Sequence, residues 1–245
     1  MPQAGPMAQS PYNGRCIGIT GSRGALGAAL TRRFRAAGAR VIGFTHSSTP
    51  PEQADGPHHW VNWSCGNEAS LDPHLEEIDV LILNHAINPQ GNQSLEVINQ
   101  ALEINALSSW RLMQRFEAIS RASPKIHPRE VWVNTSEAEI QPAVSPVYEL
   151  TKRMLGQLVS IRGAVLDETG REALTLRKLV LGPFRSSLNP IGVMDADFVA
   201  TQVLRQASWG FRLVIVTPNP LTYVLMPLTE LGRRAYSRIL SRPGP

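Results

Sequence analysis

Cysteine and long apolar runs are scarce in this sequence, and each shortage excludes a class of protein. The 245 residues include two cysteines, Cys16 and Cys65, whose spacing fits neither a disulfide framework nor a metal cage, so we expect no bound metal. No stretch offers about 18 uninterrupted apolar residues, which argues against a membrane-spanning helix. The first residues also lack the apolar core of a secretory signal. We therefore expect a cytoplasmic protein.

Charged and aromatic residues are sparse as well. They make up 18% and 6% of the chain, and the formal net charge is +4. The basic residues are scattered and no aromatic platform accompanies them, so we expect no nucleic-acid partner. A small molecule is the expected partner instead.

Short β-rich runs alternate with longer helical patterns. The predicted strands are residues 15–21, 39–46, 58–63, 78–86, 129–136, 173–182 and 211–217. The predicted helices are residues 25–37, 67–77, 94–120, 146–167 and 195–208. This alternation predicts an α/β fold of the doubly wound Rossmann type, in which helices cover both faces of a seven-stranded parallel sheet.

The same pattern indicates a single domain. Residues 1–14 are rich in Pro, Gly and polar residues and are predicted to form a flexible tail, and residues 15–245 form the domain. The stretch 47–57 is Pro-rich and short, so the helix expected after the second strand is missing or reduced to one turn.

A glycine-rich turn follows the first predicted strand. Residues 19–27 read ITGSRGALG and place Gly21, Gly24 and Gly27 at three-residue spacing before a predicted helix. Glycine permits a tight turn and a close approach of ligand, and the helix start offers N–H groups to a pyrophosphate. This context predicts a dinucleotide site rather than an ordinary strand-to-helix turn.

The end of the second predicted strand bears on the choice of dinucleotide. An NAD enzyme normally places a carboxylate there, but this chain has Thr45, His46 and Ser47. Because Arg23 in the glycine turn could meet a 2′-phosphate, the sequence predicts NADP as the cofactor. The alternative is that Arg23 is merely solvated.

Tyr148 and Lys152 lie four residues apart in a predicted helix, so their side chains share one face. A lysine cation and an oxidised nicotinamide both favour the phenolate. We therefore expect a lowered pKa for Tyr148 and a role in proton transfer. The alternative is an ordinary surface pair.

Two hydroxyls end the strand predicted over residues 129–136. Ser136 and Thr135 lie where open α/β sheets bind ligands, and strand alternation lets only one of them point into the site. We favour Ser136 as the group that stabilises charge on a substrate oxygen. Asn105, inside the long predicted helix, either holds a water that relays protons to Lys152 or lies on an exposed face.

Together these residues resemble the short-chain dehydrogenase/reductase family in its compact, single-domain form, from Cys16 to about Thr217. The resemblance implies Asn105, Ser136, Tyr148 and Lys152 as the catalytic set. It implies cofactor contacts at Gly21, Ser22, Arg23, Gly24, Leu26, Gly27, Thr45, His46, Ser47, Asn62, Trp63, Asn84, His85, Ala86, Tyr148, Lys152, Gly182, Pro183, Phe184 and Ser186. Since members usually pair through their long helices, it also implies a homodimer or homotetramer.

Three segments resemble a narrower group. NHAINPQG, VWVNTSEAE and LGPFRSSLNPIGVM are similar to the dehydrogenase domain that some bacterial proteins carry behind a sterol-desaturase-like membrane domain. That likeness implies an apolar, lipid-like alcohol or ketone as substrate. The chain departs from the family at Ile87, where glycine is usual, and at Leu181, where proline is usual. Few residues separate Ser186 from the next predicted helix, so we expect an open substrate entrance.

The last predicted helix, about residues 225–241, is amphipathic. One face carries Leu228, Leu231, Ala235 and Ile239, and another carries Arg233, Arg234 and Arg238. Such a helix either lies on an anionic membrane surface or covers its own fold or a partner subunit. We favour the second interpretation, because most amphipathic helices cover a core.

The sequence thus predicts hydride transfer between NADP(H) and a secondary alcohol or ketone. A second interpretation is an NADP-binding regulatory protein with little or no turnover, which the departures at Ile87 and Leu181 permit. A third is an epimerase or dehydratase on the same scaffold. The short C-terminal region argues against the third, since little chain remains for a nucleotide-sugar domain.

Overall fold

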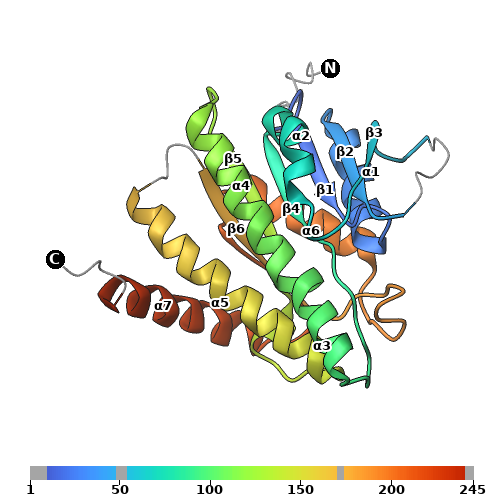
Figure 1. Ribbon diagram of the computed structural model, residues 1–245, viewed down its shortest axis with the longest axis vertical. Helices are drawn as coiled ribbons and strands as arrows, with labels where there is room; N and C mark the ends of the chain where they lie inside the picture. Colours follow the sequence, from blue (N-terminus) through green and yellow to red (C-terminus); the bar gives the residue numbers. More distant parts are fainter. Residues whose placement is uncertain (1–9, 48–53, 170–173, 241–245) are drawn as a thin grey trace, which may run out of the picture.

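The computed structural model describes residues 10–47, 54–169 and 174–240 and shows a parallel sheet between two layers of helices (Figure 1). The strands are β1 (Cys16–Thr20), β2 (Arg40–Thr45), β3 (His59–Asn62), β4 (Val80–Leu83), β5 (Arg129–Asn134), β6 (Leu174–Leu181) and β7 (Leu213–Val216). Their order is β3-β2-β1-β4-β5-β6-β7, and every neighbouring pair is parallel. The order reverses between β1 and β4, which confirms the doubly wound Rossmann-type fold and locates the ligand crevice at the ends of these strands.

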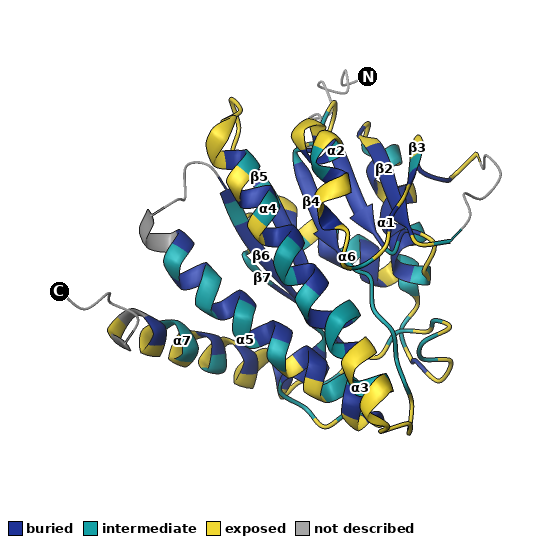
Figure 2. Cartoon of the chain, in the orientation of Figure 1, coloured by how far each residue is buried: buried dark blue, intermediate teal, exposed yellow. Residues whose placement is uncertain are grey.

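Helices cover both faces of the sheet, as predicted. They are α1 (Ala25–Ala36), α2 (Asp72–Glu77), α3 (Leu95–Leu102), α4 (Ser108–Ala122), α5 (Pro146–Thr169), α6 (Ala196–Ser208) and α7 (Thr222–Leu240). One apolar cluster joins α1 and α6 to the sheet, and a second joins α2, α4 and α5 to its other face. β1 and β4 are buried along their whole length (Figure 2), which is why their sequences are continuous apolar runs rather than alternating ones.

The structure contains short 3₁₀ and π-helical turns that the sequence did not predict. A 3₁₀ turn at Glu68–Leu71 precedes α2, and a π-helical turn at Glu103–Leu107 separates α3 from α4. A 3₁₀ turn at Glu137–Glu139 directly follows β5 and has no counterpart in the sequence-based prediction. Residues 48–53, which hold most of the expected reduced helix, lie outside the described residues.

The predicted N-terminal tail needs one correction. Residues 1–9 lie outside the described residues, but residues 10–14 form a turn in which Tyr12 is only 4% exposed. The ring of Tyr12 packs edge-on against Phe34 and Trp132, with centroids 5.0 and 6.0 Å away. The packed chain therefore includes residues 10–14, because burying this ring removes a large apolar area from water.

Within residues 10–47, 54–169 and 174–240, every helix is too short or too polar to cross a lipid bilayer.

Candidate active site

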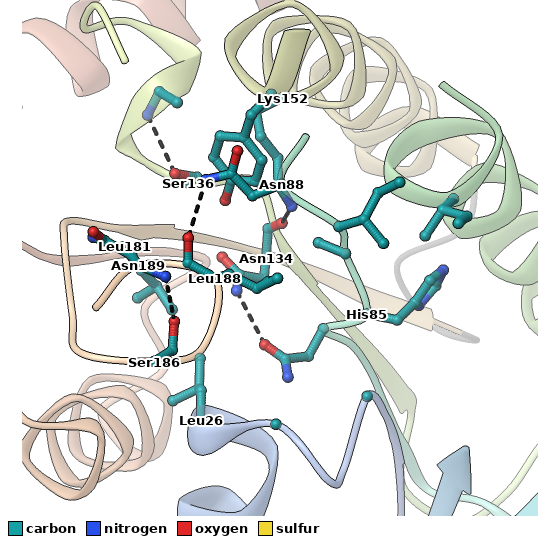
Figure 3. Close-up of a pocket in the computed structure, with 18 of the residues that line it drawn as sticks. Leu26, His85, Asn88, Asn134, Ser136, Lys152, Leu181, Ser186, Leu188 and Asn189 are labelled. Carbon is teal, nitrogen blue, oxygen red and sulfur yellow. Dashed lines mark hydrogen bonds between the residues drawn. The ribbon is translucent and has the colours of Figure 1, made fainter. Parts of the chain in front are cut away.

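A cleft of about 1190 Å³ opens at the carboxyl ends of the strands. The start of α1, the ends of β2, β4 and β5, the first turn of α5 and the segment after β6 form its wall (Figure 3). Pockets for one small ligand usually measure roughly 300–1,000 Å³. This cleft is therefore large enough for a dinucleotide with a second molecule beside it.

The glycine turn forms one end of the cleft and fits a pyrophosphate. Gly21 has a φ of +64°, and the N–H of Gly24 donates to its carbonyl oxygen at 3.0 Å. A Cβ on Gly27 would lie 2.3 Å from the same oxygen, so only glycine lets α1 start this close to the turn. The first turn of α1 has no side-chain cap and no acidic residue, which leaves its N–H groups and its positive end for an anion.

The segment at the end of β2 forms the next part of the wall. Thr45, His46 and Ser47 line the cleft beside Trp63, which follows β3, and Arg23 lines it from the glycine turn. Among the described residues at this end of β2, a carboxylate is missing, as the sequence already showed. These side chains could donate hydrogen bonds to the ribose of a dinucleotide, and no carboxylate in the described part of this segment would oppose an anionic group.

His85 lines the cleft after β4 and is held in its neutral form. Burial is the main cause that lowers the pKa of His85 to about 4, and the nearby Lys152 cation contributes to the same shift. Its Nδ1 lies 2.8 Å from Oγ1 of Thr20, and its ring meets Trp63 edge-on with centroids 5.4 Å apart. These contacts fix the segment that begins with Asn84, whose side-chain oxygen accepts from Asn134 Nδ2 at 3.1 Å.

Three side chains converge at the centre of the cleft: Ser136, Tyr148 and Lys152. Ser136 follows β5 with a φ of +73° and hydrogen-bonds with Tyr148 from the first turn of α5. Nζ of Lys152 lies over the Tyr148 ring, 5.6 Å from its centroid, and donates to the carbonyl oxygen of Asn134 at 2.9 Å. Helical spacing thus places both side chains on one face, as the sequence predicted.

The structure also separates the two candidate hydroxyls. Thr135 is fully buried, and its Oγ1 donates to the carbonyl oxygen of Leu179 on β6 at 3.3 Å. Ser136 lies in the cleft because the chain leaves the strand conformation at this residue. Its positive φ is rare for a residue other than glycine and is typical of functional sites.

The pKa of Tyr148 differs from the sequence-based expectation. Burial raises this pKa, and the hydrogen bond with Ser136 opposes the rise only in part. The lysine lies over the face of the ring rather than at the hydroxyl, which explains why it does not dominate. Tyr148 is therefore a phenol at neutral pH, ready to donate a proton.

Asn105 lies in the π-helical turn at Glu103–Leu107 and holds the chain beside the cleft. Its Oδ1 accepts from the backbone N–H of Ile87 at 2.7 Å, and its Nδ2 donates to the Ile87 carbonyl oxygen and to Thr151 Oγ1 at 2.9 and 3.0 Å. These bonds tie the segment after β4 to α5. Asn105 is fully buried, so the alternative of an exposed helix face is wrong, whereas the water relay to Lys152 stays a prediction.

Most of the predicted cofactor residues line the cleft, and four predicted site residues do not: Ser22, Gly27, Asn62 and Asn105. Oγ of Ser22 donates to the Ile19 carbonyl oxygen at 2.8 Å, and Nδ2 of Asn62 donates to that of Ser47 at 2.9 Å. The side chains of Ser22 and Asn62 therefore stabilise the backbone of the cleft wall without lining the cleft.

The sequence reasoning missed the residues on the far side of the cleft from the glycine turn. They are Asn88, Gln100, Glu103, Gln141, Val144, Leu188, Asn189 and Asn219. They lie in loops or at helix ends, where no fixed spacing marks them. The side-chain amides of the five Asn and Gln residues among them were the one available signal.

The expected open entrance is a second correction. The short segment after Ser186 folds over the cleft, with backbone hydrogen bonds of 3.1 Å between Ser186 and Asn189 in both directions. The carbonyl oxygen of Leu188 accepts from Asn88 Nδ2 at 3.1 Å and from Gln90 Nε2 at 3.3 Å, both in the segment after β4. A few residues thus cover the cleft, because they are anchored across it.

Fold and site together define a nicotinamide-dependent protein of the short-chain dehydrogenase/reductase type. Residues 17–158 match the family model described as the NAD dependent epimerase/dehydratase family. That match spans more than half of the chain, and the chain belongs to this family.

A curated relative has a narrower name. The monoglucosyldiacylglycerol epimerase of Synechocystis sp. is 38% identical over 233 residues, or 94% of this chain. The match covers 55% of the relative, so the chain spans about half of its length.

Solved structures share the fold at low identity. A bulky-bulky ketone specific alcohol dehydrogenase from Comamonas testosteroni matches with a TM-score of 0.74 and 18% identity over 95% of this chain and 98% of that one. A short-chain dehydrogenase from Burkholderia cenocepacia J2315 in complex with NADP matches with a TM-score of 0.75 and 16% identity over 95% and 99%.

Proposed function

We propose that the protein transfers a hydride between NADP(H) and the carbon of a secondary alcohol or ketone on a lipid-like substrate. The observation that carries this proposal is the meeting of Ser136, Tyr148 and Lys152 in a cleft that also contains the glycine turn. A bound nicotinamide would supply or accept the hydride, and the protein supplies the proton and the orientation.

The side chains divide the remaining work. Tyr148 donates its hydroxyl proton to the ketone oxygen during reduction and accepts it back during oxidation. Ser136 donates a hydrogen bond to the same oxygen and stabilises its developing charge. Lys152 would hold the ribose hydroxyls of a bound dinucleotide, and its positive charge favours the phenolate that remains after the proton has left.

The far side of the cleft suits an amphipathic substrate. Amide side chains there, such as Gln100 and Gln141, can exchange hydrogen bonds with hydroxyl groups, and Val144 and Leu188 offer apolar contact. Nε2 of Gln141 is buried without a hydrogen-bond partner among the described residues, which favours a polar ligand group at this point.

Epimerisation of a lipid-linked sugar is a second candidate, favoured by the relative named as a monoglucosyldiacylglycerol epimerase. In this reaction Tyr148 would take the hydroxyl proton of the carbinol as a ketone forms, and would later return it. A bound nicotinamide would hold the hydride in between and would give it back to the opposite face of the same carbon. The carbon would undergo no net oxidation.

A single assay separates the candidates. The protein is incubated with NADPH or NADP⁺ and a panel of bulky apolar ketones, the corresponding alcohols and monoglucosyldiacylglycerol, and nucleotide and lipid products are quantified together. In net hydride transfer the amount of NADPH changes in proportion to the amount of product. In epimerisation the sugar headgroup changes while the total amount of NADPH stays the same. Cofactor binding without turnover on any substrate would overturn both candidates and support a regulatory protein.

The preference for NADP has its own test. We expect the protein to bind NADPH about tenfold or more tightly than NADH, because a charged hydrogen bond to phosphate contributes about 1.5 to 3 kcal/mol. In Arg23→Ala this preference should shrink while NADH affinity stays unchanged, as measured by quenching of tryptophan fluorescence. Arg121→Ala, on α4 and outside the cleft wall, is the matched control. Equal affinities in the parent protein would refute the preference.

A further inference from the structure

Helix α7 packs with its polar side inward. Its buried positions recur every three to four residues and include Thr222, Met226, Glu230 and Ser237. Large apolar side chains on and just before the helix are 43% to 72% exposed, namely Leu221, Tyr223, Val224, Leu225, Leu228, Leu231, Tyr236 and Ile239. Figure 2 shows exposed positions repeating along the helix. We call these eight residues the α7 apolar face. As predicted, α7 docks on its own fold, chiefly against α5, but it does so through its polar side and leaves the apolar side exposed.

Buried charges fix this orientation. Lys178 on β6 is 2% exposed, and its Nζ donates to Glu139 Oε1 at 2.9 Å and to Glu230 Oε2 at 2.8 Å. Arg233 pairs with Glu139, and Arg234 pairs with Glu230 at 2.7 Å. Burial alone would raise the pKa of Glu230, but Lys178 and its other partners lower it overall, so the carboxylate stays charged. Rotating α7 would strand these charges without partners, so the α7 apolar face cannot turn inward.

The start of α7 lies at the cleft. Pro218 and Asn219, which immediately precede the helix, line the cleft wall. Thr222 donates a hydrogen bond to Glu137, the residue after Ser136. The α7 apolar face is therefore continuous with the entrance.

Other exposed apolar side chains lie at the cleft or close to it in the sequence. Val144 lines the cleft and is 90% exposed. Ile191 and Val193 closely follow the cleft-lining residue Asn189 in the chain and are 79% and 69% exposed. Exposed apolar side chains thus come from α7 and from two further segments.

A lipid bilayer fits this surface better than a protein does. A partner subunit seated across the α7 apolar face and the rim would close the entrance, whereas a bilayer would present lipid there. Tyr223 and Tyr236 are amphipathic aromatic residues of the kind that favour membrane interfaces. The net charge of +4 favours an anionic lipid surface.

We propose that the α7 apolar face and the entrance rim dock on the surface of an anionic lipid bilayer, so that a lipid substrate enters the cleft directly from the bilayer. The docking itself is independent of the reaction, and only the direct entry of substrate rests on the proposed function. The helix would lie in the membrane interface without crossing it.

Vesicle flotation tests the docking. The protein is mixed with vesicles of phosphatidylcholine and phosphatidylglycerol, and the bound fraction is measured after centrifugation. The test variant is Leu228→Gln/Leu231→Gln/Ile239→Gln, in which each changed side chain is at least 62% exposed, so the fold should persist. We expect its partition coefficient to fall at least about tenfold.

The matched control changes three exposed apolar residues near the opposite ends of strands, in Ile126→Gln/Trp209→Gln/Phe211→Gln, and should bind like the parent. Absence of binding by the parent, or equal binding by the test variant, would overturn the docking. So would a parent dimer that the test variant converts to a monomer without vesicle binding, since the face would then join two copies. Turnover of a dispersed, short-chain ketone with NADPH is measured in parallel. If that turnover persists without vesicle binding, the docking fails and the proposed function stands.

Discussion

Replacing Tyr148 with Phe is expected to reduce turnover about 10³-fold, the middle of the range that one positioned acid–base group contributes. The change removes the hydroxyl that hydrogen-bonds with Ser136 and keeps the ring under Lys152 Nζ, 5.6 Å from its centroid. The walls that hold the dinucleotide are untouched. Cofactor affinity, followed by quenching of tryptophan fluorescence through Trp63 in the cleft wall, should therefore stay unchanged.

Tyr236→Phe is the control for loss of a phenol elsewhere, because Tyr236 lies on α7 and is 65% exposed. It should keep the parent turnover. If Tyr148→Phe stays within about tenfold of the parent, another group supplies the proton and the proposed roles are wrong. If it loses cofactor binding as well, the defect lies in the site's structure and the variant does not test proton transfer.

The cofactor half of the site was predictable because its residues are tied to regular elements. Gly21, Gly24 and Gly27 have a fixed spacing at the turn from β1 into α1. Tyr148 and Lys152 share a helix face wherever that helix packs. Such local rules need no knowledge of neighbouring segments, so they hold in the folded chain.

The substrate half was not predictable for the opposite reason. Leu188 covers the cleft through bonds to Asn88 and Gln90, about a hundred residues earlier in the chain. The π-helical turn that places Asn105 likewise depends on its bonds to Ile87 and Thr151. The position of Leu188 and the π-helical turn at Asn105 both depend on contacts between segments that are distant in the sequence. Hydrophobic periodicity does not report such contacts.

Helix α7 shows a further limit of pattern reading. The sequence correctly separated an apolar face from a basic one, but a helical pattern alone does not say which face is covered. The deciding residue is Lys178, which lies in an almost wholly buried strand. A buried cation needs carboxylate partners, and Glu230 on α7 is one of them, so the polar face turns inward.

Replacing Lys152 with Met should stabilise the fold while removing activity. Lys152 is 2% exposed, and burial lowers its pKa to about 8, with Glu139 opposing the change only in part. A shift of this size from the ordinary value corresponds to a cost of about 3 kcal/mol for the charged form. Met fills a similar volume without charge but leaves the Asn134 carbonyl oxygen without its donor, a loss of about 1 kcal/mol. We expect a net gain of about 2 kcal/mol at pH 7, or a rise in Tm of about 4 to 8 °C.

The pH dependence of this gain provides the sharper measurement. The lysine of the unfolded chain keeps its proton up to about pH 10.5, whereas the folded site releases it near pH 8. Between these values the unfolded state binds more protons, so the stability of the parent rises with pH. The advantage of Lys152→Met should therefore be full below pH 8 and disappear toward pH 10.5.

Lys125→Met is the control, because Lys125 lies at the surface and pairs with Asp79 at 2.6 Å. It should show no gain in stability at pH 7. The test measures thermal unfolding of the parent and both variants from roughly pH 6 to 10. This range covers most of the pH values at which the protonation of Lys152 differs between the folded and the unfolded protein. A less stable Lys152→Met at pH 7 would mean that the buried cation supports the fold. A more stable but inactive one would mean that the protein keeps a costly charge at this position because proton transfer by Tyr148 requires it.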